Sequence, residues 1–336
     1  MKVAITGATG FVGRALAERL LRESQPLGIQ QVRVHGRRAE ALQDLLSQGA
    51  EFAGGDMADP AVAHAVAAGM DVVVHCAGKS GGLGGPANQY NVNITGTQAM
   101  LDAAHAAGVR RLINIGTPSM YFDYTDTPNR REDYRPARWA DAYSASKVEA
   151  ERRVLDAATA DFVTLSLRPR FTSGWGETNI LTRFVTMQQQ GKLRIIGSGQ
   201  NYVDFTAIDN LVDALVLAMT VQAPAVNGKA YNITNGAPVQ LWPFLNQMFE
   251  LLGLPPVTRR VPYPVAVTVG SVVQTLAALR GTEPSMSRLG TAIAAKTMTM
   301  DIGAARRDLG YTPRRTNADM LADFVRWQRS QHPSRG

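Results

Sequence analysis

Short runs of apolar residues alternate with helical patterns through the first half of the chain. Runs of this length are typical of strands that are buried on both faces of a parallel sheet. The alanine-rich stretches between them end at glycine, as helices packed closely on a sheet do. This alternation predicts an α/β fold with a doubly wound parallel sheet. The expected strands are VAI (3–5), VRV (32–34), VVVHC (72–76), LINI (112–115) and FVTLSL (162–167), and helices are expected at 61–69 and 99–108.

The pattern changes after residue 170, where Gly, Pro and Trp become frequent, as in SGWGE and LGLPPV. Strands and helices no longer alternate regularly there, which indicates a smaller part of mixed α/β structure. The run AYNIT (230–234) has the character of one more strand of the first sheet. We therefore expect a first domain of residues 1–170 and 202–233, and a second domain of residues 171–201 and 234–336.

The most apolar segment of the chain is VPYPVAVTVGSVVQTLAAL (261–279). Pro, Gly, Ser, Gln and Thr interrupt it, whereas a membrane-spanning helix needs about 20 mostly apolar residues. Thr268, Ser271 and Thr275 recur at helical spacing and make one side of the helix more polar. We expect this helix to pack over a substrate pocket or against the second subunit of a homodimer. A helix lying weakly on a lipid surface is the alternative.

Composition places the chain among soluble globular proteins, with 45% apolar and 19% charged residues in a length of 336. The single cysteine, Cys76, excludes an internal disulfide. MKVAITGATG enters a strand pattern without an apolar leader, so we expect a cytoplasmic protein. The five histidines contain no pair at metal-ligand spacing, and we predict no metal site.

The net charge of +7 is compatible with nucleic acid, an acidic membrane surface, or an anionic cofactor and substrate. Lys and Arg occur singly or in pairs, and aromatic residues do not interleave with them as they do in a single-strand-binding groove. We interpret the excess as solvated surface with a contribution from phosphate binding, and we expect no nucleic-acid partner.

The stretch TGATGFVG places Gly7, Gly10 and Gly13 between a predicted strand and a predicted helix. In this context the first glycine permits the tight turn, the second lets the backbone approach a pyrophosphate, and the third lets helix and strand pack closely. The helix N-terminus would face the anion with free N–H groups. The sequence therefore predicts a dinucleotide-binding turn in preference to a plain strand–helix connection.

The end of the second predicted strand discriminates between two cofactors. A carboxylate at this position binds the ribose hydroxyls of NAD, whereas this chain has Gly36, Arg37 and Arg38. A guanidinium can hold a 2′-phosphate through two hydrogen bonds. We therefore favour NADP(H) and retain NAD(H) as the alternative.

The segment DAYSASKVEAE (141–151) separates Tyr143 from Lys147 by one helical turn. The pair is either an acid–base device or two ordinary surface side chains. Asp141 is a good N-cap for this helix, and Val148 and Leu155 are expected to mark its buried side.

TGATGFVG, GDMAD (55–59), HCAG (75–78), NITGT (93–97) and YSASK (143–147) occur in this order, and together they resemble the extended short-chain dehydrogenase/reductase family. The resemblance covers essentially the whole chain. It implies a Rossmann domain followed by a small substrate domain, and hydride transfer between a nicotinamide cofactor and a carbonyl or alcohol.

The resemblance also implies four catalytic roles. Tyr143 would donate or accept the proton of the substrate oxygen, and Lys147 would favour its phenolate and bond the nicotinamide ribose. Thr117 would hydrogen-bond the substrate carbonyl, and Asn93 would support proton relay. Besides Tyr143 and Lys147, the implied cofactor contacts are Gly7, Thr9, Gly10, Phe11, Val12, Gly13, Arg37, Arg38, Asp56, Met57, Cys76, Ala77, Gly78 and Pro169, and the implied substrate contacts are Lys79, Ser119 and Arg170.

The glycine-rich loop AGKSGGLGGPANQY (77–90), the Pro-Ser of IGTPSMYF and LRPRFTSGWG are similar to the 3β-hydroxysteroid dehydrogenase and 2-alkyl-3-oxoalkanoate reductase branch. This implies reduction of a 3-oxo group, or oxidation of a 3-hydroxyl group, on a lipophilic β-keto acid or steroid-like molecule. Arg170 would then meet a substrate carboxylate or make a structural ion pair.

Two other interpretations remain open. A nucleotide-sugar epimerase or dehydratase would share the first domain, but GTPS (116–119) lacks the Asp-Glu pair of dehydratases. A non-catalytic NADP-binding protein or a membrane-associated protein on the same fold is the second. The non-catalytic protein is expected to lose the Tyr or the Lys, and the membrane-associated one would depend on the helix at 261–279.

Overall fold

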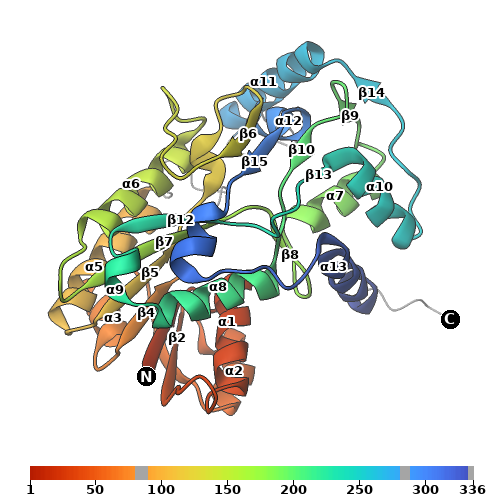
Figure 1. Ribbon diagram of the computed structural model, residues 1–336. Helices are drawn as coiled ribbons and strands as arrows, with labels where there is room; N and C mark the ends of the chain where they lie inside the picture. The colour runs from red at the N-terminus through yellow and green to blue at the C-terminus, as the bar shows by residue number, and fades with distance from the viewer. Residues whose placement is uncertain (80–89, 281–287, 332–336) are drawn as a thin grey trace.

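The computed structural model describes residues 1–79, 90–280 and 288–331, and its centre is a parallel sheet of seven strands (Figure 1). The strand order is β12-β7-β5-β4-β1-β2-β3, which reverses direction at β1 and β4 as in a doubly wound sheet. The strands are β1 (Lys2–Thr6), β2 (Gln31–Gly36), β3 (Glu51–Gly54), β4 (Val72–His75), β5 (Arg111–Ile115), β7 (Val163–Pro169) and β12 (Lys229–Ile233).

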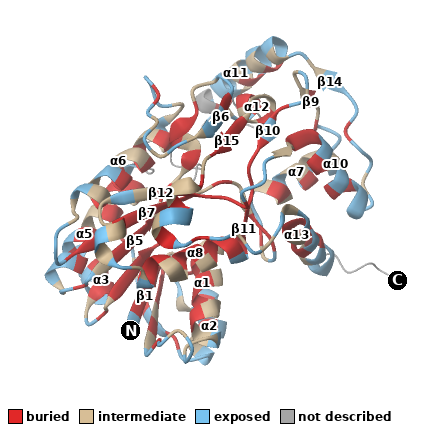
Figure 2. Cartoon of the chain, viewed as in Figure 1, coloured by how far each residue is buried: buried red, intermediate tan, exposed pale blue. Residues whose placement is uncertain are grey.

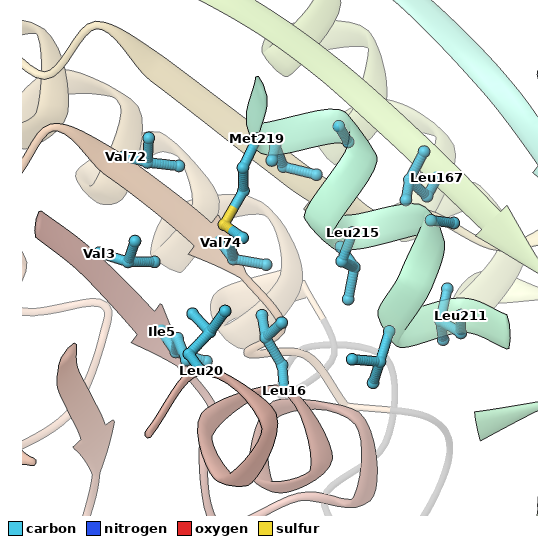
Figure 3. Packing of buried hydrophobic residues seen from close by; sticks show 14 of the residues in the cluster. Val3, Ile5, Leu16, Leu20, Val72, Val74, Leu167, Leu211, Leu215 and Met219 are labelled. Atoms are coloured by element: carbon cyan, nitrogen blue, oxygen red, sulfur yellow. The ribbon is translucent and has the colours of Figure 1, made fainter. Parts of the chain in front are cut away.

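Helices cover both faces of this sheet, because successive side chains of each strand point to opposite sides. In β1, Val3 and Ile5 join the core under α1 (Phe11–Arg22) and α8 (Ile208–Thr220), as Figure 3 shows. Ala4 points the other way, into the core under α3 (Pro60–Ala67), α5 (Gly96–Ala106) and α6 (Ala142–Asp156). Short helices α2 (Gln43–Ser47) and α9 (Ala223–Val226) and the 3-10 turn Ala39–Leu42 complete the layers.

The remaining elements form a smaller unit with its own core around Trp242, Phe205 and Phe324. Its four-stranded sheet has the order β13-β10-β15-β6, so that β6, from the first half of the chain, pairs with β15. The strands of this unit are β6 (Thr127–Arg130), β8 (Thr172–Ser173), β9 (Ile195–Ile196), β10 (Tyr202–Val203), β11 (Thr206–Ala207), β13 (Val239–Gln240), β14 (Arg260–Val261) and β15 (Met298–Met300), and the helices are α7 (Ile180–Gln189), α10 (Leu241–Leu251), α11 (Tyr263–Leu279), α12 (Arg288–Ala295) and α13 (Asn317–Gln331).

The predicted fold class is confirmed, and all five expected strands are present, with each end within two residues of its predicted position. AYNIT is found as β12, paired with β7. The sequence analysis missed β3, an edge strand in which Ala53 alone is buried, because it has no apolar run. The domain limits stay a prediction.

Helix α11 corresponds to the apolar segment, and no helix in the described part of the chain is long and apolar enough to cross a membrane. Small residues, Ala266, Gly270 and Ala277, occupy its buried side, on which it packs against α12. The larger side chains Val265, Val269, Val272 and Leu276 face outward and are 46–54% exposed (Figure 2). The helix thus presents a stripe of aliphatic side chains to its surroundings.

Candidate active site

The glycine turn follows β1 closely and packs against the end of β4. Gly7 has a φ of +66°, and a Cβ there would lie 2.8 Å from the backbone nitrogen of Ala77. A Cβ on Gly13 would lie 2.6 Å from the carbonyl oxygen of Gly7. Gly7 thus makes the turn and Gly13 allows α1 to approach it, as expected from their spacing.

The N-terminus of α1 fits an anion. Gly10 is its N-cap and supplies no side-chain acceptor, and the first turn carries no acidic residue. Its N–H groups and the positive end of the helix dipole therefore point at the space above the turn. These features fit the pyrophosphate of a dinucleotide. Thr9 and Gly10 are exposed on this surface, while Phe11 and Val12 are half-buried beside it.

Two buried histidines, which the sequence analysis did not assign, support this turn. His35 bonds the carbonyl oxygen of Gly55 through Nε2 at 3.1 Å, so its Nδ1 is free to accept from the Gly7 N–H at 3.5 Å. His75 lies in β4 between Thr6 and Thr97. The sequence offers one indication of this role for His75. It lies in the run VVVHC, at the end of a strand that reaches the carboxyl edge of the sheet.

The hydrogen bonds around His75 determine which group donates and which group accepts in each contact. The Thr97 hydroxyl donates to the carbonyl oxygen of Asn93 at 2.7 Å, so it must accept from Nε2 of His75 at 3.0 Å. Nδ1 of His75 then accepts from the Thr6 hydroxyl at 2.9 Å, and that hydroxyl accepts from the N–H of Ala77. Burial lowers the pKa of His75 to about 3, with the positive charge of Lys147 adding to the effect. The ring is therefore neutral.

Arg37 and Arg38 follow β2 and are both exposed. Within the described residues neither makes a hydrogen bond or an ion pair, which leaves both guanidinium groups available. Gly36 precedes them, and a Cβ there would lie 2.8 Å from Cγ2 of Thr9. The arginines thus lie next to the glycine turn.

The other expected cofactor contacts lie along the same edge of the sheet. Asp56 is exposed and accepts from the N–H of Ala58, while Met57 is buried beneath it. Cys76 and Ala77 are half-buried and Gly78 is exposed directly after β4. Burial raises the pKa of the Cys76 thiol to about 12, although Lys147 opposes the shift. Pro169 ends β7 and is half-buried.

Helix α6 carries Tyr143 and Lys147. The carboxylate of Asp141 accepts from the N–H of Ser144 at 2.7 Å and caps the helix as expected. Lys147 is only 8% exposed, and its ammonium donates to the carbonyl oxygen of Ile115 at the end of β5, at 2.8 Å. Val148 and Leu155 are half-buried, so the expectation that they mark the buried side is wrong. That side carries polar groups because it faces the site; its members are Ser144, Ser146, Lys147, Ala150, Glu151 and Val154.

Tyr143 and Thr117 are brought together from α6 and the residue after the β5 end. Burial raises the pKa of Tyr143, a side-chain hydrogen bond with Thr117 opposes the rise, and Asp141 adds to it. The Thr117 hydroxyl also caps the 3-10 turn Pro118–Tyr121, accepting from the N–H of Ser119 and donating to its hydroxyl at 3.0 Å. The Thr117 hydroxyl thus stands beside the phenol of Tyr143, and the Ser119 hydroxyl stands next to Thr117.

Asn93 lies fully buried in the π-helical turn Asn91–Thr95 that precedes α5. Its amide binds both backbone groups of Lys79, at 2.8 and 3.1 Å, and donates to the hydroxyl of Ser146 at 3.0 Å. Asn93 therefore links α6 to the chain leaving β4. A Cβ on Gly78 would lie 3.4 Å from Oδ1 of Asn93 and 3.5 Å from Nζ of Lys147, which places both side chains at one point.

Arg170 makes internal contacts. It is 4% exposed and stacks on the ring of Phe171 at 4.0 Å. Burial lowers its pKa to about 10 despite Asp204, and Nε and Nη2 have no hydrogen-bond partner among the described residues. Of the other two expected substrate contacts, Ser119 adjoins Thr117 and Lys79 adjoins Asn93. Residues 80–89 of the glycine-rich loop lie outside the described residues.

An apolar cavity of about 290 Å³ opens in the smaller unit, and its lining begins at Phe171, two residues beyond the half-buried end of β7. Helices α7, α11 and α12 and strand β9 form it, and Trp242 closes it. Among the described residues that line it, Arg183, Lys192 and Arg194 are basic and none is acidic. The lining includes Phe171, Ile180, Phe184, Met187, Leu193, Ile196, Val261, Ala266 and Ile293.

The doubly wound sheet, the uncapped glycine turn and the Tyr143–Lys147–Thr117 group define a nicotinamide-dependent oxidoreductase of the extended short-chain dehydrogenase/reductase class, acting on CH–OH and C=O groups. Residues 4–263 match the model of the 3-beta hydroxysteroid dehydrogenase/isomerase family. The chain belongs to this family. Among the described residues, no group of three or more His, Cys, Asp or Glu is arranged to hold a metal ion.

Relatives support the same assignment. A 2-alkyl-3-oxoalkanoate reductase of Stenotrophomonas maltophilia is 35% identical over 93% of this chain and 95% of its own length. A mouse sterol-4-alpha-carboxylate 3-dehydrogenase (decarboxylating) is 27% identical over 93% of this chain and 86% of its own. The fold is shared with a UDP-glucuronic acid 4-epimerase of Bacillus cereus solved with NAD, at a TM-score of 0.77 and 20% identity, covering 99% of this chain and all of that one.

Proposed function

We propose that this protein is an NADP(H)-dependent reductase of a 3-oxo group on a lipophilic carboxylic acid, a β-keto acid in the first instance. The observation that carries the proposal is the grouping of Tyr143, Thr117 and the buried Lys147 ammonium at the carboxyl edge of the sheet. The smaller unit adds an apolar cavity lined by cations, whose lining begins at Phe171, two residues after the end of β7. Two relatives support the proposal, because their names, 2-alkyl-3-oxoalkanoate reductase and sterol-4-alpha-carboxylate 3-dehydrogenase, describe action on such molecules.

In this proposal two hydroxyl groups hydrogen-bond the substrate carbonyl oxygen, that of Tyr143 from α6 and that of Thr117 from the end of β5. A nicotinamide dinucleotide held through its pyrophosphate at the glycine turn would supply the hydride. Tyr143 donates its proton to the oxygen as negative charge develops there, and Lys147 stabilises the phenolate that remains. Asn93 holds Lys79 and Ser146, so it keeps α6 and the β4 end in register during this step.

Arg37 and Arg38 would select NADP(H). Both are exposed next to the glycine turn, and neither has a competing carboxylate among the described residues. A phosphate there would gain charge-assisted hydrogen bonds without breaking an existing ion pair.

The cavity would hold the hydrocarbon part of the substrate. An apolar cavity of 150 Å³ accommodates benzene, so about 290 Å³ accommodates a longer alkyl chain or part of a ring system. The cations at its lining would meet a carboxylate, in keeping with the absence of acidic residues from the lining.

The outward stripe of α11 (Val265, Val269, Val272 and Leu276) would rest on an anionic membrane surface. The flanking Arg259, Arg260 and Arg280 are exposed, and the segment 258–280 contains no acidic residue. Aliphatic side chains and flanking cations together are the features of an interfacial helix. Because Ala266 and Val261 line the cavity, a lipophilic substrate would reach it from the same surface. The competing possibility is that the stripe contacts the second subunit of a homodimer.

A substrate panel tests the proposed function. Purified protein is incubated with NADPH or NADH and a 2-alkyl-3-oxoalkanoate, a 3-oxosteroid or a nucleotide sugar, and cofactor absorbance is followed. We expect oxidation of NADPH with the first substrate. Turnover of the nucleotide sugar alone would replace the proposal by the epimerase alternative.

A further inference from the structure

Glu151 is a buried carboxylate one helical turn beyond Lys147 in α6. It is 3% exposed and binds the guanidinium of Arg168, itself fully buried, through both carboxylate oxygens at 2.5–3.1 Å. The hydroxyl of Ser166 donates to Oε2 at 2.8 Å. Such a pair is expensive to bury, so its presence calls for a local reason.

The carboxylate packs directly on the backbone that carries the site. A Cβ on Gly116 would overlap Oε2 of Glu151 and would lie 2.7 Å from the hydroxyl of Ser166. Gly116 stands between Ile115, whose carbonyl oxygen binds Lys147, and Thr117, whose hydroxyl binds Tyr143. Glu151 therefore supports from behind the three residues that hold both members of the acid–base pair.

Charge gives Glu151 a second link to the site. Burial lowers the pKa of Lys147, and Glu151 is the largest influence that opposes this, followed by Cys76. His75 also faces the ammonium but is neutral. On the far side, Arg168 contacts the phenol of Tyr121 and the backbone oxygen of Glu132, which keeps its guanidinium away from Lys147.

We propose that Glu151 is a positioning residue of the reductase: it keeps the Lys147 ammonium protonated and holds Ile115–Thr117 against α6, with Arg168 and Ser166 fixing the carboxylate. Only the description of the enzyme as a reductase rests on the proposed function, because the contacts of Glu151 do not depend on it. Glu151 touches neither substrate nor cofactor and acts through Lys147 and Gly116.

The test is the titration of Lys147 in the full-length protein, followed by NMR of ¹³C-labelled lysines and assigned with Lys147→Arg. We expect Glu151→Gln to lower the midpoint by about one pH unit or more. Because that variant leaves Arg168 unpaired, the double variant Glu151→Gln/Arg168→Gln is made as well, and we expect it to show the same direction. Glu149→Gln is the matched control, since Glu149 pairs with Arg152 and Arg153 on the outer side of the same helix.

The pH profile of kcat/KM for alcohol oxidation is the second readout, and its alkaline limb, where Lys147 loses its proton, should move with the Lys147 midpoint. A folded Glu151 variant with an unchanged Lys147 midpoint and profile, but a lower Tm, would show a purely structural role and overturn the proposal. If the midpoint shifts while wild-type protein reduces no carbonyl in the panel, the coupling stands and the proposed function fails.

Discussion

The ammonium of Lys147 donates to the carbonyl oxygen of Ile115 at 2.8 Å, which ties the middle of α6 to the end of β5. This bond fixes the lysine while leaving its remaining N–H groups for a ribose. It also places the tyrosine one turn earlier beside Thr117, so a single helix position sets the geometry of the whole group.

Replacement of Tyr143 by Phe removes the hydroxyl that we propose as the proton donor and changes the side-chain volume little. We expect kcat for carbonyl reduction to fall about 10³-fold, the usual scale for a positioned general acid. NADPH affinity, measured by fluorescence titration, should stay within about twofold, since the glycine turn is unaffected. Tyr202→Phe, at an exposed tyrosine of the small sheet, is the control. Full activity of Tyr143→Phe would disprove the assigned mechanism.

Replacement of Arg37 by Ala should weaken NADPH binding far more than NADH binding. A charge-assisted pair with phosphate contributes about 1.5–3 kcal/mol, which corresponds to a ten- to hundredfold change in Kd. Calorimetric titration of both cofactors measures the ratio, and Arg22→Ala, at an exposed arginine ending α1, is the matched control. Equal losses for the two cofactors would argue for NAD(H).

Replacement of Ile293 by Trp fills the apolar cavity from its half-buried wall. Burying a methylene contributes about 0.8 kcal/mol, so each one excluded from the cavity lowers kcat/KM about fourfold. We expect long-chain 2-alkyl-3-oxoalkanoates to lose activity and short-chain ones to keep it. Leu251→Trp, at an exposed leucine ending α10, is the control. If activity falls equally for long-chain and short-chain substrates, the alkyl group of the substrate does not bind in this cavity.

Replacement of both Val269 and Leu276 by Glu puts two charges into the outward stripe of α11. We expect sedimentation with vesicles containing phosphatidylglycerol to be lost, and wild-type binding to weaken with salt. Thr268→Glu/Thr275→Glu adds the same charges at exposed polar positions of the same helix and should reduce sedimentation less. A different outcome would show that the stripe is a dimer contact. In that case the wild type does not bind vesicles, and light scattering shows a dimer for the wild type and a monomer for the Val269→Glu/Leu276→Glu variant.

The buried neutral His75 makes folding sensitive to acid. Its pKa falls from an ordinary 6.5 to about 3 on folding, so its contribution is complete above pH 6.5 and declines as the pH drops toward 3. At pH 4.5 the loss should be about 3 kcal/mol. Urea unfolding at pH 7 and 4.5 should therefore show a smaller difference for His75→Gln than for wild type, whereas exposed His64→Gln should match wild type. Equal differences for all three proteins would contradict the buried neutral ring.

The sequence predicted the sheet well because its central strands are buried on both faces and therefore appear as uninterrupted apolar runs. It missed β3, whose single buried residue leaves no such run. It also assigned the buried side of α6 to Val148, because buried Lys147 and Glu151 look like surface residues to any hydrophobic pattern. The glycine turn and the YSASK pair were visible since each lies within a few consecutive residues.

The cavity and the histidine supports could not be seen in this way. Phe171, Trp242 and Ile293 meet in one cavity although more than a hundred residues separate the first from the last. The roles of Thr6 and Thr97 depend on His75 standing between them, and no local motif records that arrangement.

The pairing of β6 with β15 joins Thr127 to Met298, residues far apart in the chain. During synthesis, β6 leaves the ribosome long before its partner exists, whereas most of the large sheet can already assemble. The small sheet must therefore close late, and a chain stopped before residue 298 would expose an unpaired strand. A stalled or truncated product is for this reason a natural target for chaperones and proteases, and the two halves of this enzyme mature as one unit.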